Sequence, residues 1–188
     1  MQNLLRSVQT LQRRLSEAGV LSVVIGSVAV GAWGDPRLTR DVDLKVLLDR
    51  QEADRLLAVL GSDYTSLLPD PRQTLRHQGV VFVQDPEGTR LDLLLADTPY
   101  DVVAIERGRD VELQPGFTLR LCSPEDLVIY KLISIRPRDR EDARGVIRRQ
   151  GQALDDAYVL DWLRQFETAL DDPTLVVEYK RLRAEFTP

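Results

Sequence analysis

Two acidic residues separated by one residue are the part of this chain best suited to chemistry. Asp41 and Asp43 lie in a short alternating stretch, residues 41–46, in which the intervening side chains are apolar. If this stretch is a strand, both carboxylates point to the same side. Ionised carboxylates side by side repel each other, and a divalent cation removes that conflict. Two such ions about 3.5–4 Å apart are the usual arrangement for displacement at phosphorus, so the pair predicts a metal site.

A glycine-serine turn precedes the acidic pair. Gly26-Ser27 ends the apolar run 20–25, and thirteen residues separate it from Asp41. The residues after the turn are compatible with a short helix up to Trp33, and a strand-to-helix turn exposes backbone N–H groups. The turn therefore predicts a phosphate cradle that faces the metal site.

A third aspartate lies on another predicted strand. In residues 90–96, Arg90, Asp92 and Leu94 share one face, and leucines occupy the other. An acid in a leucine-rich strand has two explanations. It is either a salt-bridged residue at a strand edge or the missing ligand of a two-metal site, and we favour the second.

The composition excludes several other kinds of site. Cys122 is the only cysteine and His77 the only histidine among 188 residues, which argues against disulfide scaffolds, zinc sites and histidine-based catalysis. No apolar run is long enough for a bilayer span, and the N-terminus lacks the pattern of a secretory signal. We therefore expect a cytoplasmic protein without a membrane partner.

Charge is unevenly distributed. The net charge of −5 does not favour nucleic-acid binding by the whole protein. Residues 131–149, however, carry seven basic side chains against three acidic ones. This segment could hold a triphosphate or an RNA backbone, and the alternative is a solvated helix face.

Apolar periodicity predicts an α/β (α+β) fold. Helices are expected over about 4–18, 27–33 and 51–60, and strands over 20–25, 41–48, 80–83 and 90–96. From Ser123 onward the pattern is helical, with further apolar repeats near residues 143–147, 160–166 and 175–186. We expect a single compact unit, with a small mixed sheet flanked by helices in residues 1–121 and a helical part packed on it in residues 122–188.

Several segments together resemble a known superfamily. They are Ile25-Gly26-Ser27-Val28-Ala29, Trp33-Gly34, Arg37-Leu38-Thr39-Arg40-Asp41-Val42-Asp43-Leu44, Arg90-Leu91-Asp92-Leu93-Leu94, Ser123-Pro124-Glu125-Asp126-Leu127, Lys131, Arg136-Pro137-Arg138-Asp139 and Glu141-Asp142. This order resembles the nucleotidyltransferases of the DNA polymerase beta-like superfamily, and more narrowly the AbiEii-like and MenT-like enzymes of bacterial toxin–antitoxin systems. The resemblance covers roughly residues 20–147. Within this interpretation, residues 1–121, which contain the three aspartates, would be the catalytic core.

The resemblance implies a catalytic role for the three aspartates. Asp41, Asp43 and Asp92 would hold two Mg²⁺ ions, which prefer oxygen ligands. Asp92 would also assist deprotonation of the attacking hydroxyl. Gly26 would let the backbone approach the triphosphate, and Ser27 would add its N–H and hydroxyl.

The remaining predicted nucleotide-binding residues have weaker support. The resemblance implies that Lys131 contacts the triphosphate, and the alternative is a lysine that extends from a buried helix to solvent. Asp139 and Asp142 would surround the site, although a helix N-cap explains Asp139 equally well. Arg37 and Thr39 would lie near substrate or behind the acids.

The implied reaction transfers a nucleoside monophosphate from a triphosphate such as ATP to an acceptor hydroxyl and releases pyrophosphate. RNA, such as a tRNA 3′ end, is the favoured acceptor, and a protein is the other. The resemblance also implies a toxin with a cognate antitoxin. The main alternative is a non-catalytic, nucleotide-binding, antitoxin-like module of the same fold, and a purely structural domain would leave the paired acids unexplained.

Overall fold

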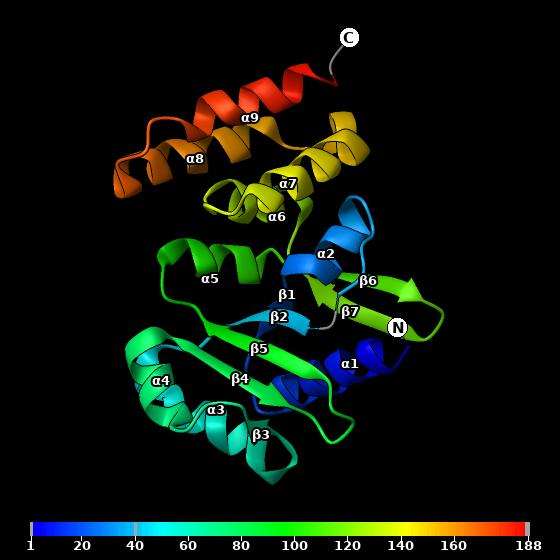
Figure 1. Cartoon of the computed structure of the whole chain (residues 1–188), viewed down its shortest axis with the longest axis vertical. Coiled ribbons are helices and arrows are strands. Elements are labelled where there is room, and N and C mark those ends of the chain that lie inside the picture. The colour runs from blue at the N-terminus through cyan, green and yellow to red at the C-terminus, as the bar shows by residue number, and fades with distance from the viewer. Residues whose placement is uncertain (1, 40, 187–188) are drawn as a thin grey trace. The chain divides into compact units, whose positions relative to one another are not determined.

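A computed structural model describes residues 2–39 and 41–186 of the chain; Arg40, part of the motif above, lies outside them. A mixed sheet organises the first part (Figure 1). Its seven strands among the described residues have the order β3-β4-β5-β2-β1-β7-β6. They are β1 (Ser22–Val24), β2 (Asp41–Val46), β3 (Thr65–Ser66), β4 (Val80–Gln84), β5 (Arg90–Leu95), β6 (Arg109–Gln114) and β7 (Phe117–Leu121).

Helices alternate with these strands and then follow them. They are α1 (Gln2–Glu17), α2 (Gly26–Trp33), α3 (Ala53–Leu60), α4 (Pro71–Gln78), α5 (Pro99–Glu106), α6 (Pro124–Leu132), α7 (Pro137–Gln150), α8 (Asp156–Leu170) and α9 (Leu175–Ala184). Short 3₁₀ turns occupy Arg50–Glu52, Gly61–Asp63 and Gly151–Ala153. None of the helices in the described ranges has the length and apolar character that crossing a bilayer requires.

The chain forms two compact units, which are described separately. The first comprises residues 1–28 and 38–122 and holds the sheet. The second comprises residues 29–37 and 123–188 and is helical. The second unit thus includes most of α2 and the loop after it, besides the C-terminal segment.

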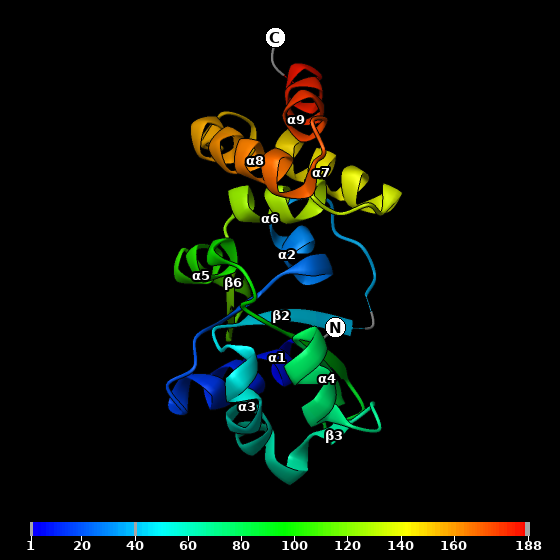
Figure 2. The ribbon, with the colours of Figure 1, turned by 90° about the vertical axis from the view of Figure 1, so that its left-hand side faces the viewer.

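The central strands have two different faces. In β2, Val42, Leu44 and Val46 are buried on the face covered by α1, α3 and α4 (Figure 2). The other face carries Asp41 and Asp43, which are only partly buried. Alternation along the strand therefore separates an apolar core side from an acidic side.

An ion pair fixes α5 on the acidic side of the sheet. The Lys45 Nζ lies 2.8 Å from the Asp101 Oδ1; the Asp101 side chain is buried, and that of Lys45 is 13% exposed. The other Asp101 oxygen accepts hydrogen bonds from the backbone N–H groups of Asp97 and Thr98. This pairing positions the start of α5 relative to β2.

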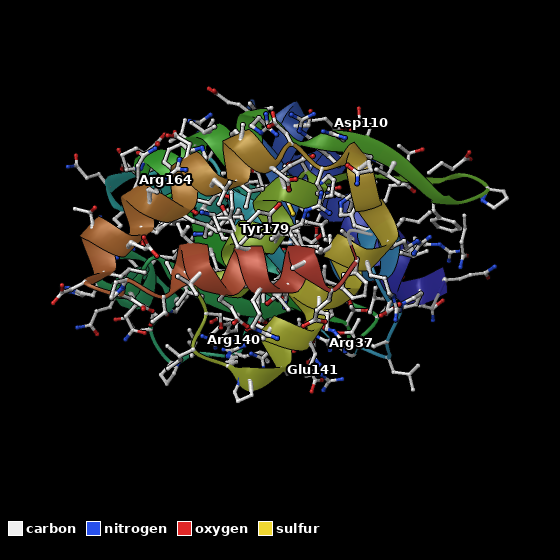
Figure 3. The ribbon with its side chains drawn as sticks, turned by 90° about the horizontal axis from the view of Figure 1, so that it is seen from above. Arg37, Asp110, Arg140, Glu141, Arg164 and Tyr179 are labelled. Atoms are coloured by element: carbon white, nitrogen blue, oxygen red, sulfur yellow. The ribbon has the colours of Figure 1, made fainter. Side chains whose placement is uncertain are left out.

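Tight packing and buried polar contacts hold the helical unit together. Tyr179 of α9 is 1% exposed, and its hydroxyl donates to the Asp156 carboxylate of α8 (Figure 3). Burial and this acceptor raise the pKa of Tyr179. Asp126 accepts hydrogen bonds from Ser123 (2.6 Å) and Tyr158 (2.6 Å), so its buried carboxylate is satisfied.

The expected α/β architecture is confirmed, and several elements extend it. Each strand predicted between residues 20 and 96 is present, with ends shifted by one or two residues. The helices α4 and α5 and the strands β3, β6 and β7 were not predicted. Both helices carry clear start signals in the sequence. Asp70 caps α4 and precedes Pro71, and a Thr98–Asp101 capping box begins α5.

Candidate active site

The three predicted catalytic acids lie on one face of two neighbouring parallel strands. The register of β2 and β5 places Asp43 opposite Asp92, and Asp41 opposite Arg90. Neighbouring strands lie about 4.8 Å apart, and residues in register share a face. The sheet therefore brings together Asp41, Asp43 and Asp92 within the first unit.

Gly26 closes one side of this acidic face. It has φ +62°, and a Cβ at this position would lie 2.0 Å from the Asp43 Oδ2. No other residue fits here without displacing that carboxylate. Gly26 also begins α2, so the first N–H groups of a helix lie beside Asp43, as the phosphate-cradle prediction requires. Ser27 follows in the first turn and is 8% exposed.

Thr39 contacts an acid directly. Its hydroxyl lies 2.9 Å from the Asp41 Oδ1 and 2.9 Å from the Asp41 backbone oxygen. A hydroxyl that donates to a carboxylate restricts its rotamer. Thr39 therefore contacts an acid of the acidic face directly, and its predicted place near the substrate or behind the acids stays a prediction.

Asp92 is held by an arginine of its own strand. The Arg90 Nε lies 2.7 Å from the Asp92 Oδ1, and the Arg90 Nη2 lies 2.9 Å from the Oδ2. The guanidinium Cζ also lies 4.8 Å from the centroid of the Phe82 ring. The hydrogen bond to Asp92, and attraction to Asp92, Asp41 and Asp43, raise the pKa of Arg90.

The donor set matches a hard divalent cation in its chemistry. Three carboxylates on one strand face offer the oxygen ligands that Mg²⁺ prefers. Across the described ranges, however, no three acidic, histidine or cysteine side chains are already arranged as a metal site. Both Asp92 oxygens accept from Arg90, so Asp92 is at once a salt-bridged acid and the third acid of the face.

The second unit contains a separate cluster of predicted residues. The Lys131 Nζ lies 2.5 Å from the Asp139 Oδ1 and 2.8 Å from the Asp142 Oδ2. The Ser134 hydroxyl donates to the other Asp139 oxygen at 2.6 Å. The Lys131 side chain is 9% exposed, so it does not extend into solvent.

The cluster is balanced in charge. Arg37 lies 3.3 Å from Asp142, so two cations face two carboxylates. Burial alone raises the pKa of Asp139, but hydrogen bonds from Lys131 and Ser134, with attraction to Lys131 and Arg136, hold that pKa below its ordinary value. Asp139 lies inside the first turn of α7, whose N-cap is Arg136, so the N-cap explanation for Asp139 is wrong.

The basic segment is largely engaged within the second unit. Arg144 lies 2.6 Å from Glu185, Arg148 2.6 Å from Asp35, and Arg149 donates to the Gly34 backbone oxygen at 2.7 Å. Arg140, labelled in Figure 3, lies 3.8 Å from Glu178. Arg136 and Arg138 are exposed. Most of this predicted phosphate-binding surface therefore stabilises the unit's own packing.

A cavity of about 450 Å³ in the first unit lies away from the acids. It is lined by α1 and by strands β1, β6 and β7, including Gln12, Ser22 and Asp110. The Gln12 side-chain amide donates to the Arg120 backbone oxygen at 2.9 Å and accepts from the Arg120 N–H at 3.1 Å. Arg120 lies in β7 next to Leu121, the residue that pairs with β1. None of the predicted site residues lines this cavity.

Two residues of the acidic face were not predicted as functional. Arg90 and Lys45 share the face of Asp41 and Asp43, and each pairs with an acid. The signal for Arg90 was in the sequence, because residues two apart on a strand share a face. The signal for Lys45 was weaker, since its partner lies on a helix that had not been predicted.

Comparisons with known proteins support the fold. No protein-family model and no curated protein matches the chain. Among solved structures, the solution structure of the antibiotic-resistance factor ANT(2'')-Ia aligns with a TM-score of 0.60 at 13% identity, covering 90% of this chain and 96% of that one. A crystal structure of the same factor with adenylyl-2''-tobramycin aligns at 0.53 and 11% identity, covering 97% and 98%.

A third structure extends the likeness beyond that one factor. An antigenic nucleotidyltransferase-like protein from Paracoccidioides brasiliensis aligns with a TM-score of 0.52 at 20% identity, covering 93% of this chain and 92% of that one. At such identities the likeness concerns the backbone alone. The chain therefore has a nucleotidyltransferase-like fold, a mixed sheet flanked by helices.

Proposed function

We propose that this chain is a metal-dependent nucleotidyltransferase. It would move a nucleoside monophosphate from a nucleoside triphosphate to an acceptor hydroxyl and release pyrophosphate. The observation that carries the proposal is the register of β2 and β5, which puts Asp43 opposite Asp92 on the face that also carries Asp41. Ionised carboxylates so placed repel one another; Arg90 offsets part of this repulsion, and a bound cation would offset more of it.

Each residue of the acidic face has a role in this proposal. Asp41, Asp43 and Asp92 hold Mg²⁺, which supplies charge stabilisation for the transferred phosphoryl group. Thr39 holds the Asp41 carboxylate in position. Gly26 leaves room for Asp43, and the first N–H groups of α2, with Ser27, bind phosphate oxygens. Asp92 accepts the proton of the attacking hydroxyl.

Lys131 has a conditional role. Its ammonium group is engaged by Asp139 and Asp142. Contact with a triphosphate would require the group to leave at least one of these carboxylates. We therefore assign Lys131 and its two acids, together with Arg37, first to the stability of the second unit.

The acceptor is the finer part of the proposal. A tRNA 3′ end or another RNA remains the acceptor proposed from the sequence resemblance, with a toxin role and a cognate antitoxin. Arg136 and Arg138 are the exposed basic residues that support it. A small hydroxylated molecule is the second candidate, because the structure of ANT(2'')-Ia contains adenylyl-2''-tobramycin.

A non-catalytic, nucleotide-binding module is the competing function, and one observation favours it. Asp92 is fully engaged by Arg90, as a structural acid would be. Such a module would bind nucleotide or a partner without turnover.

Transfer of label distinguishes these functions. The wild-type protein is incubated with each α-labelled triphosphate and Mg²⁺, in parallel with an RNA pool and with an aminoglycoside panel. Labelled RNA or a labelled small molecule identifies the acceptor, and the Asp43→Asn variant must lose the signal. Nucleotide binding without label transfer to any acceptor supports the non-catalytic module. Growth arrest on expression tests the toxin role.

A further inference from the structure

We infer that Arg90 and the divalent cation compete for the Asp92 carboxylate, so that Arg90 controls how readily the site takes up metal. The inference rests on the proposed function, because it concerns the same acidic face. Arg90 is then a positioning residue that acts through Asp92.

The geometry of the pair is the first argument. Both guanidinium contacts, at 2.7 and 2.9 Å, are made to different oxygens of Asp92. A bidentate pair of this kind occupies one lone-pair site on each oxygen and offsets the negative charge that a metal ion would use. Asp92 is therefore a weaker metal ligand while Arg90 holds both of its oxygens.

The surroundings of Arg90 are the second argument. Its register partner on β2 is Asp41, and the partner of Asp92 is Asp43, so the guanidinium lies on a face with three carboxylates. The positive charge of Arg90 reduces the repulsion among the acids when no metal ion is present. The guanidinium thus supplies part of the charge compensation that a cation would supply.

The accessibility of Arg90 is the third argument. Its side chain is 44% exposed, whereas that of Asp92 is 11% exposed. Phe82, opposite Asp92 on β4, offers its ring to the guanidinium at 4.8 Å. Arg90 can therefore leave Asp92 without entering the core, and it keeps an aromatic surface to rest on. The exchange requires only a side-chain rotation.

The test measures binding of Mn²⁺ alone, by the loss of the free-ion electron paramagnetic resonance signal. Arg90→Met keeps an unbranched stem over Phe82 and removes the charge and the donors. We expect this variant to bind Mn²⁺ about tenfold more tightly, the size of one lost charge-assisted hydrogen bond. The matched control is Arg76→Met, which removes an equally exposed arginine paired with Asp54 and should leave Mn²⁺ binding unchanged.

A double-mutant cycle separates competition from simple charge repulsion. If Arg90 competes for Asp92, Arg90→Met has no further effect on Mn²⁺ affinity in an Asp92→Asn background. An effect of equal size in that background overturns the inference, as does weaker or unchanged Mn²⁺ binding by Arg90→Met alone. Asp43→Asn provides the distinction from the proposed function. If wild type binds no Mn²⁺, or if Asp43→Asn does not weaken binding, the metal site itself is wrong.

A second readout does not depend on affinity. In metal-free buffer, Arg90→Met should unfold at a lower temperature than wild type, because the three carboxylates lose their compensating charge. Saturating Mn²⁺ should restore the midpoint, since only the folded site binds the ion. A midpoint that stays low at saturation indicates a structural role for Arg90 and overturns the inference.

Discussion

The acidic face of the first unit and the Lys131 cluster of the second contain similar residues, but they differ in charge balance and in burial. Among the described residues of the acidic face, three carboxylates lie near the Arg90 guanidinium, and Asp41 and Asp43 are partly exposed. In the cluster, Asp139 and Asp142 face Lys131 and Arg37, and each of the two acids is nearly buried. Three carboxylates against one guanidinium leave a surplus of two negative charges among the described residues of the acidic face. Such a surplus on an accessible face favours a ligand, whereas a buried, balanced set favours stability. We propose that this difference separates acids that serve chemistry from acids that serve the fold.

Matched acid-to-amide substitutions give the largest expected contrast. Asp43→Asn should reduce nucleotide transfer by about a thousandfold, or about 4 kcal/mol of transition-state stabilisation, because it removes a metal ligand. It should not lower the unfolding midpoint, since it also removes a repulsion. Asp142→Asn should have the opposite pattern: nucleotide transfer by the folded protein should change little, and the unfolding midpoint should fall. Transfer rates and urea unfolding of both variants check this, and equal loss of stability in the two would remove the distinction.

Removal of the cluster's central cation should have the next largest effect. Lys131→Met leaves two buried carboxylates without their partner, which should cost about 3 kcal/mol of unfolding free energy. Both tryptophans, Trp33 and Trp162, lie in the second unit, so tryptophan fluorescence follows its unfolding. Lys180→Met, on an exposed side of α9, is the control and should change little. If Lys131→Met unfolds at the wild-type urea concentration, the cluster is not structural.

Much of this contrast could be predicted from local patterns, and the rest depended on tertiary contacts. Alternation along residues 41–46 and 90–95 correctly predicted two strands with their acids on one face. It could not predict the register that pairs Asp43 with Asp92, because register depends on which strands become neighbours. Nor could it predict the partners of Lys131, since burial beside two acids is not visible in helical spacing.

Gly26 was predicted from a local sequence pattern and also makes a tertiary contact with Asp43. Its substitution should have an intermediate effect. Gly26→Ala places a Cβ in a left-handed conformation and against the Asp43 carboxylate, which should cost about 2 kcal/mol. Because Asp43 must move, Mn²⁺ binding should weaken as well. Gly31→Ala in the same helix is the control, since nothing lies within 4 Å of the added methyl group, and it should stabilise by about 0.5–1 kcal/mol. Unchanged Mn²⁺ affinity in Gly26→Ala would place Asp43 outside the metal site.

Acid titration should show how much the charge of Asp139 contributes to the stability of the cluster, and this is the smallest effect that we expect. The pKa of Asp139 is lowered in the folded protein, so its charged form stabilises the fold above the unfolded-state pKa, and this contribution is lost as the pH falls below about 4. Asp139→Asn should cost about 1 kcal/mol at pH 7, because Lys131 keeps its contact with Asp142. The difference between wild type and Asp139→Asn should then shrink as the pH falls from 5 to about 2, as the wild-type carboxyl protonates. Tryptophan fluorescence during urea unfolding at each pH measures this difference in the unit that contains Asp139. A difference that stays constant with pH would mean that the charge of Asp139 contributes nothing, and the cluster would then depend on the contacts of Asp142 with Lys131 and Arg37.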